Sequence, residues 1–244
     1  MVLASFAAGV QNALAGGGSF LTFPALLLTG LSPVAANITS TIALFPGQIA
    51  TGWAGRRDVT GLPTLSLWAL VWISVIGGGL GAALLLLTPE RVFGALVPWL
   101  VLFATAVFAW GSFVRRADQA VPTIGRRAGA LSQLAISVYG GYFGGGIGIL
   151  MLAALTMSGL GVRSAGATKN VLAGVMNASA VLIFLFSSQV AWGQAALTAM
   201  AALVGGQLGA YLFRRVNETM LRVAITAVGV ALTVGLFIRA MAQP

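Results

Sequence analysis

Apolar residues in this chain form long continuous runs instead of the alternating or one-sided patterns of soluble domains. The first half contains such runs at 2–30, 34–54, 65–88 and 92–113, separated by short polar or charged turns. Each run is long enough to cross a hydrocarbon core of about 30 Å as a helix. A transmembrane barrel would instead need short segments of alternating polarity. The pattern therefore predicts an all-α polytopic membrane protein.

Two glycine triplets interrupt these runs at matching places in the two halves of the chain. The first is Gly16, Gly17 and Gly18, and the second, 128 positions later, is Gly144, Gly145 and Gly146. Adjacent glycines destabilise a helix, and in a bilayer the freed N–H and C=O groups must be buried in protein or line a cavity. One interpretation is close helix packing through small residues. Because the breaks come as a pair, we favour the other interpretation, a binding site at the middle of the membrane.

The second half of the chain repeats the first. Thr168-Lys169-Asn170 corresponds to Thr39-Ser40-Thr41, and Gly205-Gly206 corresponds to Gly77-Gly78. Most of these matches share the spacing of the glycine triplets, which indicates an internal repeat within a single transmembrane domain at 1–244. We expect repeat 1 at about 1–114, an arginine-rich linker at 115–127 and repeat 2 at about 128–244.

Ala13-Leu14-Ala15 resembles the cleavage site of a signal peptide. The segment before it has no basic region, however, and it has a counterpart in the second repeat, where no signal peptide can lie. We therefore expect this segment to remain part of the protein.

Composition narrows the function classes. The 244 residues are 59% hydrophobic and 7% charged, far below the roughly 25% charged residues of soluble domains. The absence of Cys and His excludes disulfides, thiolate catalysis and histidine-based metal sites, and we expect no cofactor. The net charge of +9 indicates basic cytoplasmic loops rather than nucleic-acid binding. An intramembrane enzyme is disfavoured because the carboxylates lie at run ends or in loops, at Asp58, Glu90, Asp118 and Glu218.

The run at 128–159 is too long for one straight crossing, since it would measure about 48 Å as a single helix. Residues 2–30 show the same excess, so we interpret each as a broken hairpin that enters and leaves on one side. If the other six runs span and the loop at 55–58 is cytoplasmic, only Arg91 and Arg239 among the basic residues lie outside. The positive-inside rule favours this arrangement over eight single crossings, which divide the charges almost evenly.

This topology predicts two inverted-topology repeats, each with a Gly-broken helical hairpin plus three transmembrane helices. Parallel repeats of four single spans remain the alternative.

The first triplet opens the sequence Gly-Gly-Gly-Ser-Phe-Leu-Thr-Phe-Pro-Ala-Leu at 16–26, which is followed by Ala36-Asn37-Ile38-Thr39-Ser40. Together with the second triplet and Ala167-Thr168-Lys169-Asn170, it resembles the TauE/SafE sulfite exporter family, the 4-toluene sulfonate uptake permeases. The resemblance covers nearly the whole chain. It implies a multi-pass permease of the cell (inner) membrane for small sulfur-containing anions, such as sulfite, organosulfonates or sulfur-bearing organic acids. Leu152 stands where the first copy has Pro24, so the resemblance is weaker in the second copy.

An anion inside a membrane needs hydrogen-bond donors and a positive potential. Helices that begin after the glycine breaks offer both through their N-terminal N–H groups. Lys169 adds a charge, for which a functional role and snorkelling to the interface are equal alternatives. The candidate substrate-binding residues are Gly16, Gly17, Gly18, Ser19, Asn37, Thr39, Ser40, Gly144, Gly145, Gly146, Thr168, Lys169 and Asn170. Gln11 and Asn12 are further candidates for lining the cavity, whereas Asn37 and Gln48 have the alternative of hydrogen bonds between helices.

These observations predict a secondary transporter with its site at the two breaks. The alternative is a passive anion channel, which paired broken segments favour less than alternating access. No ATP-binding loop of the Gly-x-x-x-x-Gly-Lys-Ser/Thr type is present, which argues against ATP-driven transport by this chain alone. The expected partners are a small-molecule anion and the lipid bilayer, without nucleic acid, and the sequence leaves a homo-oligomer open.

Overall fold

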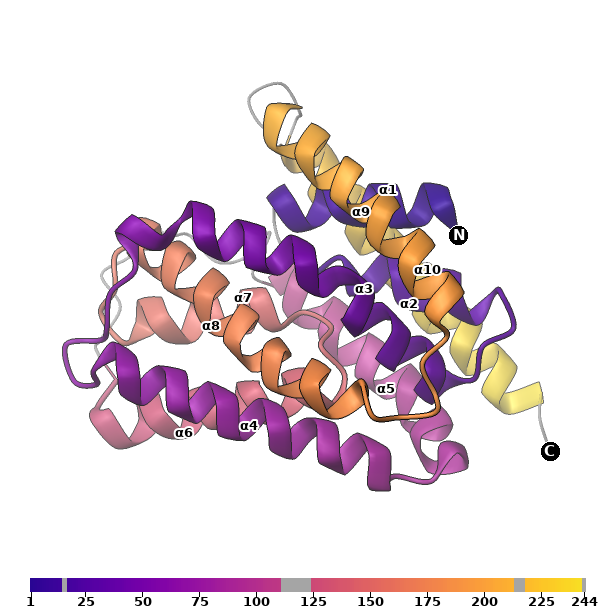
Figure 1. Ribbon diagram of the computed structural model, residues 1–244, viewed down its shortest axis with the longest axis horizontal. Coiled ribbons are helices and arrows are strands. Elements are labelled where there is room, and N and C mark those ends of the chain that lie inside the picture. Colours follow the sequence, from indigo (N-terminus) through magenta and orange to yellow (C-terminus); the bar gives the residue numbers. More distant parts are fainter. Residues whose placement is uncertain (15–16, 111–123, 213–217, 243–244) are drawn as a thin grey trace.

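The computed structural model describes residues 1–14, 17–110, 124–212 and 218–242, and these residues form helices and loops without strands. The α-helices of the described residues (Figure 1) are α1 (Val2–Leu14), α2 (Ser19–Leu27), α3 (Pro33–Ala54), α4 (Leu67–Leu87), α5 (Glu90–Ala109), α6 (Arg126–Tyr142), α7 (Ile147–Met157), α8 (Val162–Phe184), α9 (Trp192–Leu212) and α10 (Glu218–Ala242). A short 3-10 helix covers Arg56–Asp58. Gly16 and most of the expected linker, 115–123, lie outside the described residues.

The helices follow the apolar runs and start at serine caps where the sequence provides them. The Ser32 hydroxyl accepts from the Ala35 N–H with Pro33 at the first helical position, and the Ser66 hydroxyl accepts from the Ala69 N–H in the same way. In the part of the chain that the structure describes, α4, α5 and residues 163–184 of α8 are long and apolar enough to cross a membrane. Their outward faces are apolar too, since Trp68 is 71% exposed and Trp99 is 61% exposed. Such a surface indicates contact with lipid.

Small residues let the helices pack closely. A Cβ at Gly205 of α9 would overlap the Phe6 carbonyl of α1, and a Cβ at Gly77 of α4 would lie 3.2 Å from the Leu134 carbonyl oxygen of α6. Backbones that approach this closely are typical of helix packing in membranes. The packing pairs keep their pattern when α1–α5 are exchanged for α6–α10: α1 packs on α9 as α6 packs on α4, while α3 packs on α8 and α5 on α10.

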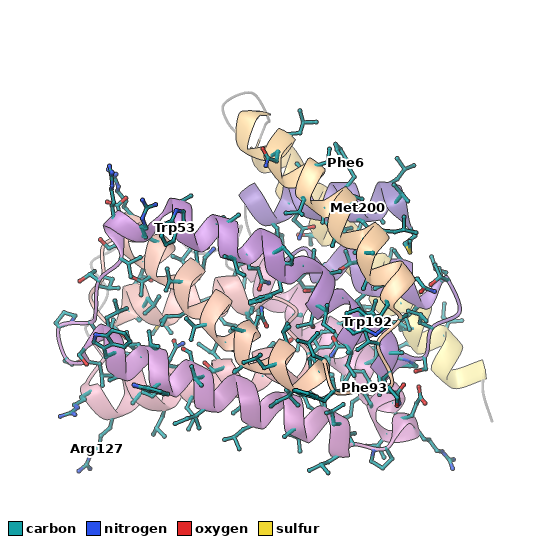
Figure 2. All side chains as sticks on the ribbon, viewed as in Figure 1. Phe6, Trp53, Phe93, Arg127, Trp192 and Met200 are labelled. Atoms are coloured by element: carbon teal, nitrogen blue, oxygen red, sulfur yellow. The ribbon has the colours of Figure 1, made fainter. Side chains whose placement is uncertain are left out.

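The middle of the molecule is the antiparallel pair of α3 and α8, which run side by side (Figure 1). The end of α3 meets the start of α8, where Arg163 forms a salt bridge of 3.1 Å with Asp58. Arginines collect at this end of the molecule. Figure 2 shows Trp53 and Arg127 there and Phe93 and Trp192 at the opposite end.

A cluster of buried aromatic rings holds α2 against the loop between α6 and α7. Phe23 of α2 meets Phe143 with ring centroids 5.6 Å apart, and Phe20 meets Phe108 of α5 at 6.1 Å. Phe143 is the first residue after α6, so this packing brings the two glycine-rich segments into one region of the fold.

Candidate functional site

The first glycine segment lies between the end of α1 at Leu14 and the start of α2 at Ser19. Two side chains from α1 reach back to it. The Gln11 amide donates to the Gly17 carbonyl at 2.9 Å, and the Asn12 side-chain oxygen accepts from the Gly18 N–H at 2.9 Å. These two bonds tie the first glycine segment to α1.

The second glycine segment lies between the end of α6 at Tyr142 and the start of α7 at Ile147. Gly144 and Gly146 have φ values of +83° and +73°, which favour glycine, and Gly146 is the residue at the N-cap of α7. No side chain caps this helix. The Ile149 and Leu150 N–H groups donate to the Gly146 carbonyl, and the N–H groups of Ile147 and Gly148 lie before these first bonds, at the start of the helix. The second glycine segment is held from α3, where the Asn37 amide donates to the carbonyl of Tyr142, the last residue of α6, at 2.9 Å.

A cavity of about 50 Å³ lies between the two segments, and we call it the Lys169 cavity. Since a water molecule needs roughly 10–15 Å³ of such space, the cavity has room for several waters or a small ion. It is enclosed by α1, the first glycine segment, α3, α7 and α8. Its lining residues are Asn12, Gly17, Gln48, Thr51, Ile147, Gly148, Lys169, Asn170 and Ala173.

The lining of this cavity suits an anion. Lys169 contributes a basic side chain, and none of the lining residues is acidic. Among the described residues, the one salt bridge joins Arg163 to Asp58 and leaves Lys169 out. Ile147 and Gly148 place the N-terminus of α7, with its N–H groups and positive dipole end, at the same cavity.

Gln48 is fixed in this lining by a contact between α3 and α8. Its side-chain oxygen accepts from the Asn177 amide at 2.6 Å, so its own NH₂ group is the part that can donate to a ligand. Asn12 and Asn170 add two further amides to the lining. The cavity therefore combines one lysine amino group, three carboxamides and a helix N-terminus.

The candidate residues from the sequence divide into two groups. Gly17, Lys169 and Asn170 line the cavity, and Gly146 precedes the α7 residues that do. The remaining described candidates hold the surroundings together. Asn37 bonds to Tyr142, as stated above. The Thr39 hydroxyl accepts from the Ala191 N–H at 3.1 Å, and the Ser40 and Thr22 hydroxyls are 2.6 Å apart.

Thr168 also contacts a loop, because its hydroxyl accepts from the Thr60 N–H and donates to the Thr60 carbonyl. Ser19 faces a small apolar cavity on the other side of the first segment, together with Phe23, Phe143 and Gly145. Gly18 is buried beside Asn12, and a Cβ at Gly144 would lie 4.0 Å from the Ser19 hydroxyl. Gly16 lies outside the described residues.

The sequence did not predict Thr51, Ile147, Gly148 and Ala173 as part of the site. It left open whether Gln48 lines the site or forms a hydrogen bond between helices. One signal was available. Gln48 and Thr51 are three positions apart on α3 and therefore share a helix face, and on α8 Ala173 lies four positions after Lys169 and three after Asn170. Two polar faces on facing helices predict a polar seam between them.

Comparison with known proteins agrees with a transport role. The family described as "Sulfite exporter TauE/SafE" matches residues 1–236. The chain belongs to this family. It is a membrane transporter, and this family is one of permeases rather than enzymes.

Three relatives of the chain are described as probable membrane transporters. A "Probable membrane transporter protein" of Haemophilus influenzae is 26% identical over 231 residues, which cover 93% of this chain and 89% of that protein. "Probable membrane transporter protein ORF9" of a Sinorhizobium species is 29% identical over 258 aligned positions, covering 100% of this chain and 92% of that protein. "Probable membrane transporter protein YfcA" of Escherichia coli K12 is 26% identical, covering 93% and 84%. No solved structure matches the chain.

Proposed function

We propose that this TauE/SafE transporter is a secondary transporter that binds a small sulfur-containing anion, such as sulfite or an organosulfonate, in the Lys169 cavity. One observation carries the proposal. Lys169, the N-terminus of α7 and the amides of Gln48 and Asn170 line the same cavity, and no acidic residue lines it. An ammonium and a helix N-terminus both attract an anion, and a partly dehydrated site strengthens that attraction. The name of the family supports sulfite as the first ligand to test.

We also propose that the chain crosses the inner membrane several times as two repeats of inverted topology. The exchange of packing partners between α1–α5 and α6–α10 supports this arrangement. The salt bridge between Asp58 and Arg163 supports it as well, because eight single crossings would put these residues on opposite sides of the membrane. The arginine-rich end would then be cytoplasmic.

A ligand-binding screen of the purified protein tests the proposed function. Isothermal titration with sulfite, thiosulfate, an organosulfonate and a carboxylate of similar size should give binding by at least one sulfur oxyanion. Lys169→Ala should weaken that binding by on the order of 1–4 kcal/mol, the Coulomb energy of a close pair in water or at a protein surface.

Two further variants control this experiment. Lys169→Arg keeps the charge and should keep most of the affinity. Arg57→Ala removes an exposed charge at the arginine-rich end, outside the Lys169 cavity, and should bind as the wild type does. If Lys169→Ala binds every sulfur oxyanion as tightly as the wild type, Lys169 is not part of the anion site.

A further inference from the structure

A second, larger cavity adjoins the Lys169 cavity. It has a volume of about 250 Å³ and lies between α1, α3 and α9. Asn12 and Thr51 line both cavities, so they lie at the boundary between them. Along α3 the larger cavity extends from Ala43 to Ala54, the last residue of the helix, and so approaches the arginine-rich end.

The corresponding region of the second half can be located from a contact between α3 and α8. Gln48 and Asn177, which hydrogen-bond to each other, are 129 positions apart, the spacing that relates Thr39 to Thr168. The same spacing relates Gly47 to Met176 and Ala43 to Leu172. The region equivalent to the larger cavity therefore lies between α6, α8 and α4.

Side chains fill this equivalent region, whereas the larger cavity between α1, α3 and α9 is open. A Cβ placed on Gly47 would meet no atom within 4 Å. Met176, its counterpart, is 0% exposed, and a Cβ on Gly140 of α6 would overlap its sulfur atom. Leu172 is also 0% exposed, in the place that Ala43 takes on α3.

We propose that the cavity between α1, α3 and α9 is the route by which the anion reaches the Lys169 cavity from the arginine-rich end. Met176 closes the equivalent route from the opposite end. This route depends on the proposed function in one respect, because it leads to the Lys169 cavity, the proposed anion site. Methionine suits a closing residue, because its unbranched side chain changes rotamer readily and repacks without a fixed shape. Release at the opposite end then requires the Met176 side chain to leave Gly140.

Thiol labelling of single-cysteine variants tests this route, since the chain contains no cysteine. Ala50 lines the larger cavity, and Ser179 is its counterpart beside Met176 on α8. With a membrane-impermeant methanethiosulfonate reagent, Ala50→Cys should react from the arginine-rich side. Ser179→Cys should react roughly tenfold more slowly or worse, since it is reached only in a minor conformation populated at about 0.1–10%.

Two added substitutions should reverse this difference in labelling rates if the proposal holds. Gly47→Met should slow the labelling of Ala50→Cys, and Met176→Ala should speed the labelling of Ser179→Cys. Gly193→Met, an exposed position of α9 outside both cavities, is the matched control and should change neither rate. Gly47→Met alone decides the matter if Met176→Ala does not fold, because the cavity has room for the added side chain.

Equal labelling of the two cysteines, or an unchanged rate at Ala50→Cys in the Gly47→Met background, would overturn the proposed route. The readout needs no substrate. A protein that shows the expected labelling but binds no anion would therefore overturn the proposed function, while the open path between α1, α3 and α9 and its closed counterpart at Met176 would stand.

Discussion

The two glycine segments occupy matching places in the two halves, but they are held in different ways. The first is closed by Gln11 and Asn12, which belong to the helix just before it. The second receives its side-chain support from Asn37 on α3, in the other half of the chain. The residue at the N-cap also differs, because Gly18 has a right-handed φ of −52° and Gly146 a left-handed φ of +73°.

This difference leaves the Gly18 N–H occupied by a side chain, whereas the start of α7 faces the Lys169 cavity. At the first segment a side chain accepts from the Gly18 N–H, so that donor is already used. At the second segment no side chain caps α7, and Ile147 and Gly148 line the Lys169 cavity. The proposed anion site therefore lies closer to the second break, although residues of the first break complete its wall.

Of the substitutions that test this difference between the two glycine segments, Asn37→Ala should have the largest effect on stability. Asn37 is 2% exposed, and its removal leaves the buried Tyr142 carbonyl without its donor. An unsatisfied buried group costs about 1–3 kcal/mol, so the apparent free energy of unfolding should fall by that amount. Anion affinity should fall too, because the second segment loses its support. Thermal unfolding in detergent and isothermal titration measure the two effects.

Thr41→Ala is the matched control for Asn37→Ala. Its hydroxyl bonds to the Asn37 carbonyl within the same helix, so its loss should leave the second segment in place. If Asn37→Ala unfolds at the wild-type temperature and binds the anion normally, the second segment does not depend on α3.

Gly144→Ala should have the next largest effect. The backbone φ of +83° disfavours any residue with a Cβ by about 1–2 kcal/mol, whereas the space around it is adequate, with the nearest atom at 3.4 Å. Unfolding should therefore report backbone strain alone. Gly166→Ala, in helix α8 with nothing within 4 Å, should instead be neutral or stabilising by up to about 1 kcal/mol. Equal stability of the two variants would show that the left-handed turn is not required.

Much of this arrangement was predictable from sequence, and the part that was not has a physical cause. The apolar runs predicted the all-helical membrane fold, because a bilayer allows few other structures. Lys169 and Asn170 stood out as polar residues in an apolar run. Hydrogen-bond partners such as Thr39 with Ala191 are 152 positions apart, and spacing alone carries no information about them. Thr39 and Thr168 therefore looked like ligand donors, although their hydroxyls bond to loops.

The asymmetry of the two breaks was also hidden in the sequence. Asn37 has Gly166 as its counterpart at the repeat spacing, and Asn12 has Gly140. Each substitution looks minor by itself. Only the packed structure shows that one amide closes the first segment and the other holds the second.

A smaller effect is expected from Asn12→Ala, which should make the first segment resemble the second. Loss of the Asn12 oxygen leaves the Gly18 N–H without its acceptor, and the net contribution of such a hydrogen bond is about 0.5–1.5 kcal/mol. Asn12→Asp keeps an acceptor and should unfold near the wild-type temperature. It also puts a carboxylate into the lining of the Lys169 cavity, so anion affinity should fall in titrations. Tighter anion binding by Asn12→Asp would contradict the assigned cavity.

The smallest effect is expected from Asp58→Asn, which tests whether the second break depends on the ends of α3 and α8. The pair is open to solvent, since the Arg163 and Asp58 side chains are 85% and 39% exposed. Exposed ion pairs contribute about 0–1 kcal/mol, and high salt screens most of that. Asp58→Asn should therefore lower the unfolding temperature slightly in dilute buffer and not at about 1 M NaCl, where the Debye length is about 3 Å. Anion affinity should stay unchanged, because the partly buried bond between Gln48 and Asn177 still aligns α3 with α8 beside the Lys169 cavity. A large loss of affinity in Asp58→Asn would instead place control of the second break at the arginine-rich end of the molecule.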